Sequence, residues 1–244
     1  MRRGDKTVLW VSAALAVIAA AAVAFSLLVL DRRPRPAANA SRSSLLVLTW
    51  APSLCKAEPS NIGCRSGHVG ELGQAFVLHG LWPQPSTEQY CDVPRRDRSR
   101  LPVELPDDLK ADLQSMMSDS SVMTNHEWYA HGTCSGVDPA EYFRIATDLA
   151  GQATAVLDPL FAGAPGGRVT SRSVREAFDS RFGRGAGARI GLSCRDAGKL
   201  GAIAYEVRLS LPPVVALGQA RPSLAAALAA GPTIPPGCGQ GPVP

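Results

Sequence analysis

The sequence predicts an α+β fold in which a mainly antiparallel sheet is flanked by helices. Apolar runs of strand length lie both early and late in the chain, and segments with helical spacing lie between them. The two kinds of segment do not alternate regularly, as they would in a doubly wound parallel sheet. With 244 residues, 45% of them hydrophobic, the chain is long and apolar enough for one domain with a buried core.

The predicted strands are short, mostly apolar runs at 45–50, 75–78, 190–194 and 204–211. The first is followed by Pro52, which favours a turn. The second leads directly into His79, so this histidine is expected at a strand end. In the last run apolar and polar residues alternate, which predicts that Glu206 and Arg208 lie on the polar face.

The predicted helices span Asp107 to Met117, Thr124 to the residue before Gly132, Asp138 past Leu149, Ser173 to Phe182, and Ser223 to Ala230. Thr124 and Glu127 fit a capping box at the start of the second helix. Asp138 stands before a proline, as a capping residue often does. Residues 55–73 and 83–106 are expected to be loops, because Gly, Ser and Pro are frequent there.

Residues 1–40 are expected to precede the folded domain, which residues 41–244 form. An uncharged run of 24 residues, 7–30, follows a basic amino end, so we expect an export signal. Two interpretations stay open: an uncleaved membrane anchor, which the length favours, and a signal peptide cleaved before Ser41. In both, the domain lies outside the cytoplasm, either periplasmic or secreted, and residues 7–30 hold it at the membrane if they are uncleaved.

The net charge of +4 comes from the amino-terminal segment. Residues 1–40 hold six of the 25 basic residues and two of the 21 acidic ones, which leaves 19 of each sign in residues 41–244. Nucleic-acid binding through a global positive field is therefore excluded, and any such binding must use local patches. One dense cluster is either a solvated loop or a phosphate-binding patch; it consists of Arg95, Arg96, Arg98 and Arg100.

The six cysteines all follow the apolar run, and an even number in an exported domain predicts three disulfides. They are Cys55, Cys64, Cys91, Cys134, Cys194 and Cys238. Composition leaves their pairing open. A cysteine metal site is the competing interpretation, and it is disfavoured because the chain contains no C-x-x-C pair.

Three of the four histidines lie in two compact motifs. His79 is followed by a glycine, which allows the backbone to turn. Glu127 and His131 are four residues apart and so share one helix face. His126 and His131 are five apart, one more than the H-E-x-x-H motif of zinc proteases requires, and this spacing argues against zinc.

Two imidazoles and a carboxylate suit a reaction that moves two protons near neutral pH. RNA transesterification is such a reaction: a base takes the proton of the ribose 2′-OH, and an acid protonates the departing 5′-oxygen. No metal or cofactor is needed, because the nucleophile belongs to the substrate. The structural alternatives are that His79 is an ordinary hydrogen-bonding residue at a strand end and that Glu127 only completes a helix cap.

The two motifs closely resemble the paired active-site segments of the ribonuclease T2 family. Residues 76–83 match F-x-x-H-G-L-W-P, and residues 126–134 match H-E-W-x-K-H-G-T-C except at Ala130. Residues 48–55 resemble the first strand of the family and the cysteine after it. The resemblance covers residues 45–238, is strongest in the first half of that range, and suggests an exported member of the bacterial type.

The resemblance implies an endoribonuclease that cleaves single-stranded RNA with low base specificity, through a 2′,3′-cyclic phosphate to 3′-phosphate ends. It implies that His131 is the general base and His79 the general acid. Glu127 would polarise the phosphate and orient His131. The residues that it places at the substrate are His126 at the phosphate, with Trp82, Tyr90 and Gln84 near the bases.

The resemblance also implies the disulfides Cys91–Cys134 and Cys194–Cys238, and with them Cys55–Cys64. It implies RNA as the substrate, no cofactor, no obligate protein partner and a monomer. At Ala130 the family usually has lysine, so this chain lacks one cation near the phosphate. This motivates one alternative, a catalytically weak relative that binds RNA or protein. A second alternative is a metal centre built from His126, His131 and Cys134.

Overall fold

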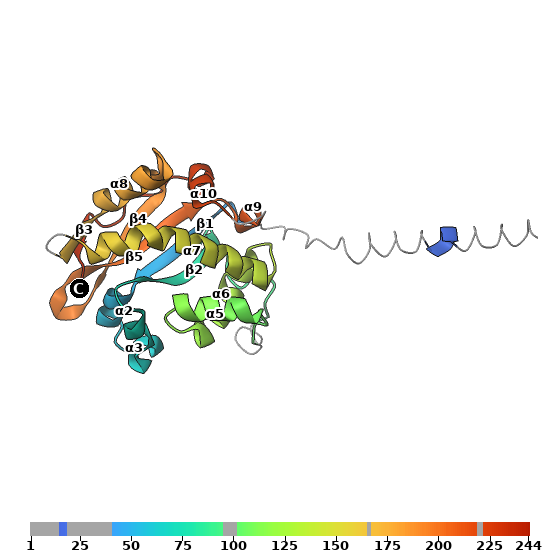
Figure 1. Ribbon diagram of the computed structural model, residues 1–244, viewed down its shortest axis with the longest axis horizontal. Helices are drawn as coiled ribbons and strands as arrows, with labels where there is room; N and C mark the ends of the chain where they lie inside the picture. The colour runs from blue at the N-terminus through green and yellow to red at the C-terminus, as the bar shows by residue number, and fades with distance from the viewer. Residues whose placement is uncertain (1–14, 19–40, 95–101, 165–166, 219–221) are drawn as a thin grey trace, which may run out of the picture. The chain divides into compact units, whose positions relative to one another are not determined.

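The computed structural model describes residues 15–18, 41–94, 102–164, 167–218 and 222–244 (Figure 1). Residues 15–18 are helical. The strands are β1 (Ser43–Trp50), β2 (Phe76–Gln84), β3 (Arg168–Thr170), β4 (Ile190–Asp196), β5 (Ala202–Leu211) and β6 (Gln240–Pro242). The helices are α2 (Ala51–Ala57), α3 (Ile62–Ser66), α4 (His68–Leu72), α5 (Asp107–Met116), α6 (Ser120–Ala130), α7 (Pro139–Ala162), α8 (Ser171–Phe182), α9 (Val214–Leu217) and α10 (Leu224–Ala230). Short 3₁₀ helices are η3 (Gly132–Cys134), η5 (Ala186–Arg189) and η6 (Gly198–Leu200).

Four strands form one antiparallel sheet in the order β2-β1-β5-β4, and β3 pairs with β6 in a small second sheet. The predicted α+β fold with an antiparallel sheet is therefore confirmed. All four predicted strands are present, but β2 runs on to Gln84 instead of ending before His79. The pairing of β3 with β6 was not predicted, because strands of three residues carry no recognisable pattern.

Helix α7 crosses the sheet and packs against β1 and β2 (Figure 1). Asp138 caps it by accepting a hydrogen bond from the backbone N–H of Glu141, as expected. Its buried side chains recur at helical spacing and include Tyr142, Ile145, Leu149, Ala153 and Leu157. Near its end the ring of Phe161 lies 5.3 Å from that of Trp50 and 4.6 Å from that of Phe76, measured between centroids. These ring contacts pack the end of α7 against β1 and β2.

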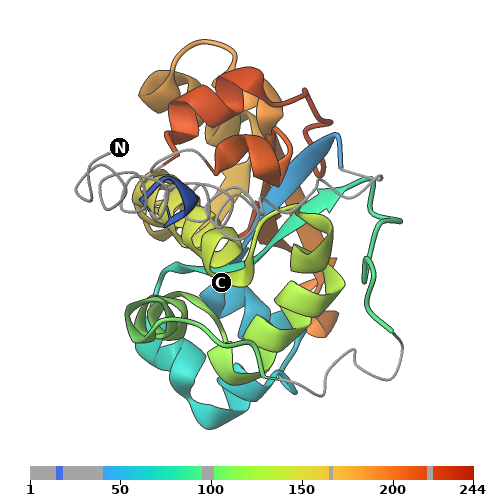
Figure 2. The same cartoon turned by 90° about the vertical axis from the view of Figure 1, so that its right-hand side faces the viewer.

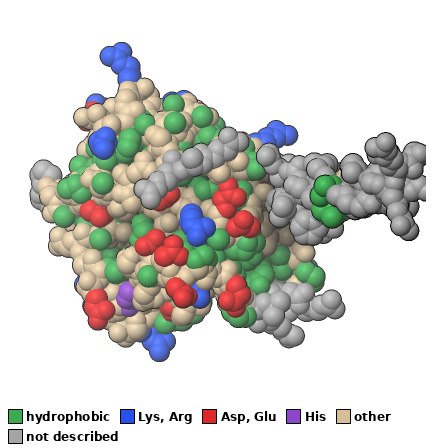
Figure 3. All heavy atoms as spheres, turned by 45° about the vertical axis from the view of Figure 1, so that its right-hand side comes forward, with side chains coloured by type: hydrophobic (Ala, Val, Ile, Leu, Met, Phe, Trp, Pro, Cys, Tyr) green, Lys and Arg blue, Asp and Glu red, His purple; other side chains and the backbone are tan. Residues whose placement is uncertain are grey.

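The other helices gather at two ends of the sheet. Figure 2 shows α2 to α6 at one end and α8 with α10 at the other, with α7 between them. On the face drawn in Figure 3, acidic side chains gather over the middle and lower part, and most of the basic ones lie toward the edges.

The prediction of a loop at residues 55–73 is wrong, because the segment from Ala51 onward contains α2, α3 and α4. Pro52 occupies the first turn of α2, where its missing N–H is not needed. The side chain of Asn61 caps α3, and Gly67 adopts a left-handed conformation, with φ of 89°, between α3 and α4. Helices of five to seven residues are too short to show periodicity in the sequence.

Three disulfides join Cys55 to Cys64, Cys91 to Cys134 and Cys194 to Cys238. These are the pairs that the family resemblance implied. The second disulfide connects the loop after β2 to η3. Only one residue, His131, separates η3 from the end of α6. It therefore ties together the two segments that carry the motifs.

Two predictions fall outside the part of the chain that the structure describes. The expected export segment, 7–30, is described only at residues 15–18, and the arginine cluster at 95–100 is not described. Among the described residues, no helix has the length and apolar character needed to cross a membrane.

The loop sizes of the disulfides give a stability prediction. Cys91→Ser with Cys134→Ser opens a loop with a sequence separation of 43 and should lower the free energy of unfolding by about 4 kcal/mol. Cys55→Ser with Cys64→Ser opens one with a separation of 9 and should lower it by about 2.5 kcal/mol. Urea unfolding of the two double variants measures both losses, and an equal or reversed order contradicts the expectation.

Candidate active site

His79 lies in the middle of β2, and a bulge sets its orientation. Val47 and Leu48 of β1 pair with Gly80 and Leu78, so that His79 is an extra residue at a shift of register. A bulge bends its strand and redirects the side chain that it carries. The expected turn at the following glycine is therefore wrong, and the irregular pairing with β1 positions the imidazole instead.

Helix α6 starts earlier than the sequence predicted. Asp119 caps it, since its carboxylate accepts a hydrogen bond from the backbone N–H of Ser121 at 3.0 Å. Thr124 lies inside the helix, and the predicted capping box of Thr124 with Glu127 is wrong. Glu127 consequently has no capping role.

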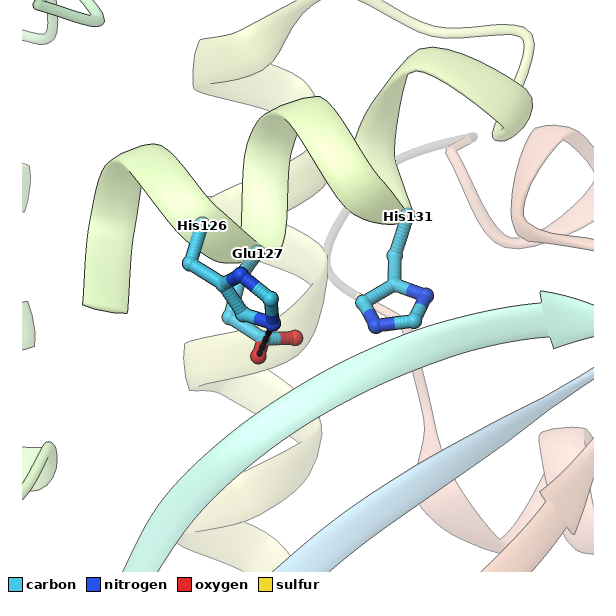
Figure 4. Close-up of side chains that lie close together, drawn as sticks. All are labelled: His126, Glu127 and His131. Carbon is cyan, nitrogen blue, oxygen red and sulfur yellow. Dashed lines mark ion pairs between the residues drawn. The ribbon is translucent and has the colours of Figure 1, made fainter. Parts of the chain in front are cut away.

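The carboxyl end of α6 carries three of the predicted residues. The helix ends at Ala130, and the backbone N–H of His131 still donates to the carbonyl of Glu127 at 3.1 Å. Figure 4 shows the side chains of His126, Glu127 and His131 projecting from this end of α6 toward the sheet. The structure thus brings the second motif over the strand that carries the first.

Glu127 is completely buried, and its two carboxylate oxygens have different surroundings. The indole N–H of Trp82 donates to Oε2 at 2.9 Å. Oε1 accepts no hydrogen bond from the described residues and lies 4.0 Å from Nε2 of His126. Burial raises the pKa of Glu127 to about 7, although the positive charge of His79 and the bond from Trp82 act to lower it. Oε1 is thus a buried oxygen without a hydrogen-bond partner among the described residues, and it lies beside the half-exposed His126.

A carboxylate that was not predicted lies behind His79. Nδ1 of His79 is 3.0 Å from Oε1 of Glu206, which is 5% exposed. The alternating pattern in β5 predicted a polar face for Glu206, but the residues on both sides of it in the strand are buried as well. The signal that could have identified it is that Glu206 is the one acidic residue in this ten-residue strand.

The two predicted catalytic histidines have opposite pKa shifts. Burial by itself lowers the pKa of His79, but the hydrogen bond that its Nδ1 donates to Glu206 and the negative charges of Glu127, Glu206 and Glu58 raise it above its usual value. Burial, together with the positive charges of His126 and His79, lowers the pKa of His131 to about 4. Near neutral pH, His131 is therefore a free base, while His79 retains its proton more readily.

The ring of Trp82 lies against both histidines. Its centroid is 5.0 Å from the ring of His79 and 5.3 Å from that of His131. The ring of His126 lies 6.0 Å from that of His131, and its side chain is half exposed. Two imidazoles with opposite pKa shifts thus lie on either side of one aromatic ring, an arrangement that can support general acid–base chemistry.

The other predicted substrate residues lie at the edges of this arrangement. The backbone N–H of Tyr90 donates to the carbonyl of Ala130 at 3.0 Å, which places Tyr90 beside the end of α6. Gln84 is at the end of β2, and its side-chain amide donates to the carbonyl of Trp82 at 3.4 Å. Gln84 is therefore held by its own strand and contacts no predicted catalytic side chain through this bond.

Within the part of the chain that the structure describes, one trio of side chains lies close enough together to hold a metal ion. Ligand atoms of His126, Glu127 and His131 lie within 4.8 Å of one another. One oxygen of Glu127 is already bonded to Trp82. The alternative centre of His126, His131 and Cys134 is wrong, because Cys134 is in a disulfide and offers no thiolate.

Comparison with known proteins identifies the family. Residues 42–214 match the model of the ribonuclease T2 family. The chain belongs to the ribonuclease T2 family. Ribonuclease MC of Momordica charantia is 32% identical over 158 residues, which cover 59% of this chain and 76% of that protein. A ribonuclease of Aeromonas hydrophila is 32% identical over 109 residues, 43% of this chain and 42% of that protein.

Solved structures show the same fold. RNase NT in complex with 5′-AMP has a TM-score of 0.61 and 24% identity, covering 83% of this chain and 96% of its own. An RNase-related protein from Calystegia sepium has a TM-score of 0.55 and 18% identity, covering 84% and 98%. The predicted enzyme class, an endoribonuclease of the T2 type, is confirmed by the family and by the named ribonuclease relatives. That it is of the bacterial type stays a prediction.

Gly80 allows Glu127 to approach β2. A Cβ at position 80 would lie 1.8 Å from Oε2 of Glu127 and 2.7 Å from the indole nitrogen of Trp82. We expect Gly80→Ala to displace the carboxylate and to lower kcat for RNA cleavage by about 10²-fold. Gly151→Ala is the matched control, since a Cβ there meets nothing within 4 Å. Equal kcat values for the two variants would contradict this account of the site.

Proposed function

We propose that this protein cleaves single-stranded RNA with low base specificity, using His131 as the general base and His79 as the general acid. The observation that carries the proposal is the opposite pKa shift of the two imidazoles on either side of Trp82. The family relationship supports the substrate class, and the geometry of this chain supports the direction of proton transfer.

In the first step, neutral His131 takes the proton of the 2′-OH, and the 2′-oxygen attacks the adjacent phosphorus. Protonated His79 gives its proton to the 5′-oxygen as the P–O5′ bond breaks, which leaves a 2′,3′-cyclic phosphate. Glu127 in its protonated form donates a hydrogen bond to a phosphoryl oxygen, and the exposed His126 contacts the same group. Such preorganised donors stabilise the charge that develops on the phosphate.

In the second step the roles of the histidines are exchanged. Neutral His79 takes a proton from water, the resulting oxygen attacks the cyclic phosphate, and protonated His131 returns its proton to the 2′-oxygen. The product is a 3′-phosphate, and both histidines regain their initial protonation states. No metal or cofactor enters either step.

Low base specificity follows from the kind of contact available to the bases. Trp82 offers an aromatic face beside the catalytic histidines, and Tyr90 lies nearby. Stacking contributes about 1–3 kcal/mol per base and accepts any base. Gln84 is the third residue that the family resemblance places near the bases. Its side-chain amide donates a hydrogen bond to the carbonyl of Trp82 in the same strand.

The three disulfides support an extracytoplasmic location, where such bonds persist. Whether residues 7–30 anchor the protein or are removed belongs to the proposal, with the anchor favoured by the length of the run. We also propose that the protein works as a monomer without an obligate protein partner.

Ala130 favours one alternative, a weak relative that mainly binds RNA or protein. Its side chain is 1% exposed and carries no charge where the family usually has lysine. Cleavage of RNA by the purified protein in excess EDTA separates the two functions. Cyclic-phosphate ends that disappear in both His79→Ala and His131→Ala support the enzyme, and binding without cleavage between pH 4 and pH 8 supports the alternative.

A change of leaving group tests which histidine is the acid. On uridylyl-3′,5′-adenosine, His79→Ala and His131→Ala should each lower kcat/KM by about 10²–10⁴-fold. Uridine 3′-(4-nitrophenyl phosphate) releases a stable phenolate that needs no proton. His79→Ala should therefore lose less than about tenfold on it, whereas His131→Ala should keep its full defect. The reverse pattern would exchange the proposed roles.

Restoring the missing cation tests the importance of Ala130. We expect Ala130→Lys to raise kcat/KM on RNA by as much as about 10²-fold, because a cation near the phosphoryl oxygens stabilises their charge. Ala130→Met adds similar bulk without charge and should give no gain. The initial rate and the melting temperature of each variant are measured. An unchanged rate in a folded Ala130→Lys protein would show that another cation already stabilises the charge on the phosphoryl oxygens.

A further inference from the structure

The carboxylate of Glu206 is held on every side by side chains from the sheet. Nδ1 of His79 binds its Oε1 at 3.0 Å, and the Thr49 hydroxyl donates to the same oxygen at 3.4 Å. Nη2 of Arg208 donates to Oε2 at 3.2 Å. These partners come from β2, β1 and β5, so the carboxylate is fixed by the register of three neighbouring strands.

We propose that Glu206 is a positioning residue for the acid of the reaction. Because an ionised carboxylate only accepts hydrogen bonds, it requires a proton on Nδ1 of His79 and leaves Nε2 to carry the proton for the leaving 5′-oxygen. This inference rests on the proposed function, in which His79 protonates that oxygen. It deepens the function by assigning the control of the acid to a strand outside both sequence motifs.

Glu206 is suited to this role because it stays ionised. Burial by itself raises the pKa of Glu206, but the hydrogen bond and the charge of His79, together with Arg208, lower it below its usual value. A carboxylate behind an imidazole fixes the orientation of the ring and stabilises its protonated form, as in serine protease triads.

Several charged or titratable groups surround His79, and they act on it differently. They are His126, Glu127 and His131 from the end of α6, Glu58 at the end of α2, and Glu206 and Arg208 from β5. Among the carboxylates in the described residues, Glu206 alone is hydrogen-bonded to His79. Glu127 and Glu58 act through space, so they cannot select between the two ring nitrogens.

The test is Glu206→Gln, which keeps the size of the side chain and removes its charge. Without the negative charge of Glu206, His79 loses its proton at lower pH. In the pH profile of kcat/KM on uridylyl-3′,5′-adenosine, the alkaline limb of the variant should therefore lie about one pH unit or more below that of wild type. At pH 7 cleavage of this dinucleotide falls by about tenfold or more. The rate on uridine 3′-(4-nitrophenyl phosphate), which needs no acid, stays within about twofold of wild type.

Three comparisons separate positioning from a general structural effect. Glu71→Gln removes the same charge from an exposed site on α4 and should leave the pH profile in place. Glu206→Asp keeps the charge and should recover part of the loss. His79→Ala with Glu206→Gln should be no slower on the dinucleotide than His79→Ala alone, because the two residues act as one unit.

Equal losses of Glu206→Gln on the two substrates, or an unmoved alkaline limb, would overturn the proposal. Titration of the His79 ring by NMR supplies a measurement that needs no catalysis, and its midpoint must fall in Glu206→Gln. If wild type cleaves no RNA while this midpoint still falls, the proposed function fails and the pairing of Glu206 with His79 stands. If wild type cleaves RNA and the midpoint does not move, the inference alone fails.

Discussion

The hydrogen bond from the indole of Trp82 to Glu127 joins the two halves of the candidate active site. Its partners are 45 residues apart in the chain and belong to β2 and α6. A buried polar group that loses its hydrogen-bond partner destabilises a protein by about 1–3 kcal/mol, so this bond favours one placement of the helix on the sheet. The missing side chain of Gly80 makes the approach possible.

Burial acts on both of the proposed catalytic imidazoles, and the charges around each one decide how it titrates. Desolvation alone would make both histidines neutral near pH 7. On the sheet side, the carboxylates of Glu206 and Glu127 offset this effect at His79. At His131 the charges that act are those of His126 and His79, and they lower its pKa in the same direction as burial does. Different surrounding charges thus give one residue type the opposite pKa shifts that the proposed base and acid need.

Most of the site could be predicted because its reacting groups lie within two short stretches of sequence. His79 with Trp82, and Glu127 with His131, are close neighbours in the chain, so local motifs record them. Glu206 could not be found in this way, since it is 127 residues from His79 and its alternating strand suggested a polar face. Alternation indicates which residues share a face, but it does not show whether that face is covered.

The fold shows the same division between local and long-range information. Asp138 and the apolar stripe after it predicted α7 because both signals are local. The bulge at His79 depends on its pairing with β1, which no local pattern encodes. The start of α6 was misplaced because Thr124 and Glu127 imitate a cap, whereas Asp119 provides the real one.

The most direct measurement of this account is the titration of the histidine rings in the wild-type protein by NMR, with His79 and His131 assigned through their alanine variants. The account predicts that His131 stays neutral until the pH falls to about 4, while the midpoint of His79 lies above its ordinary value of 6.5. Indistinguishable midpoints, or a midpoint of His131 above that of His79, would contradict it.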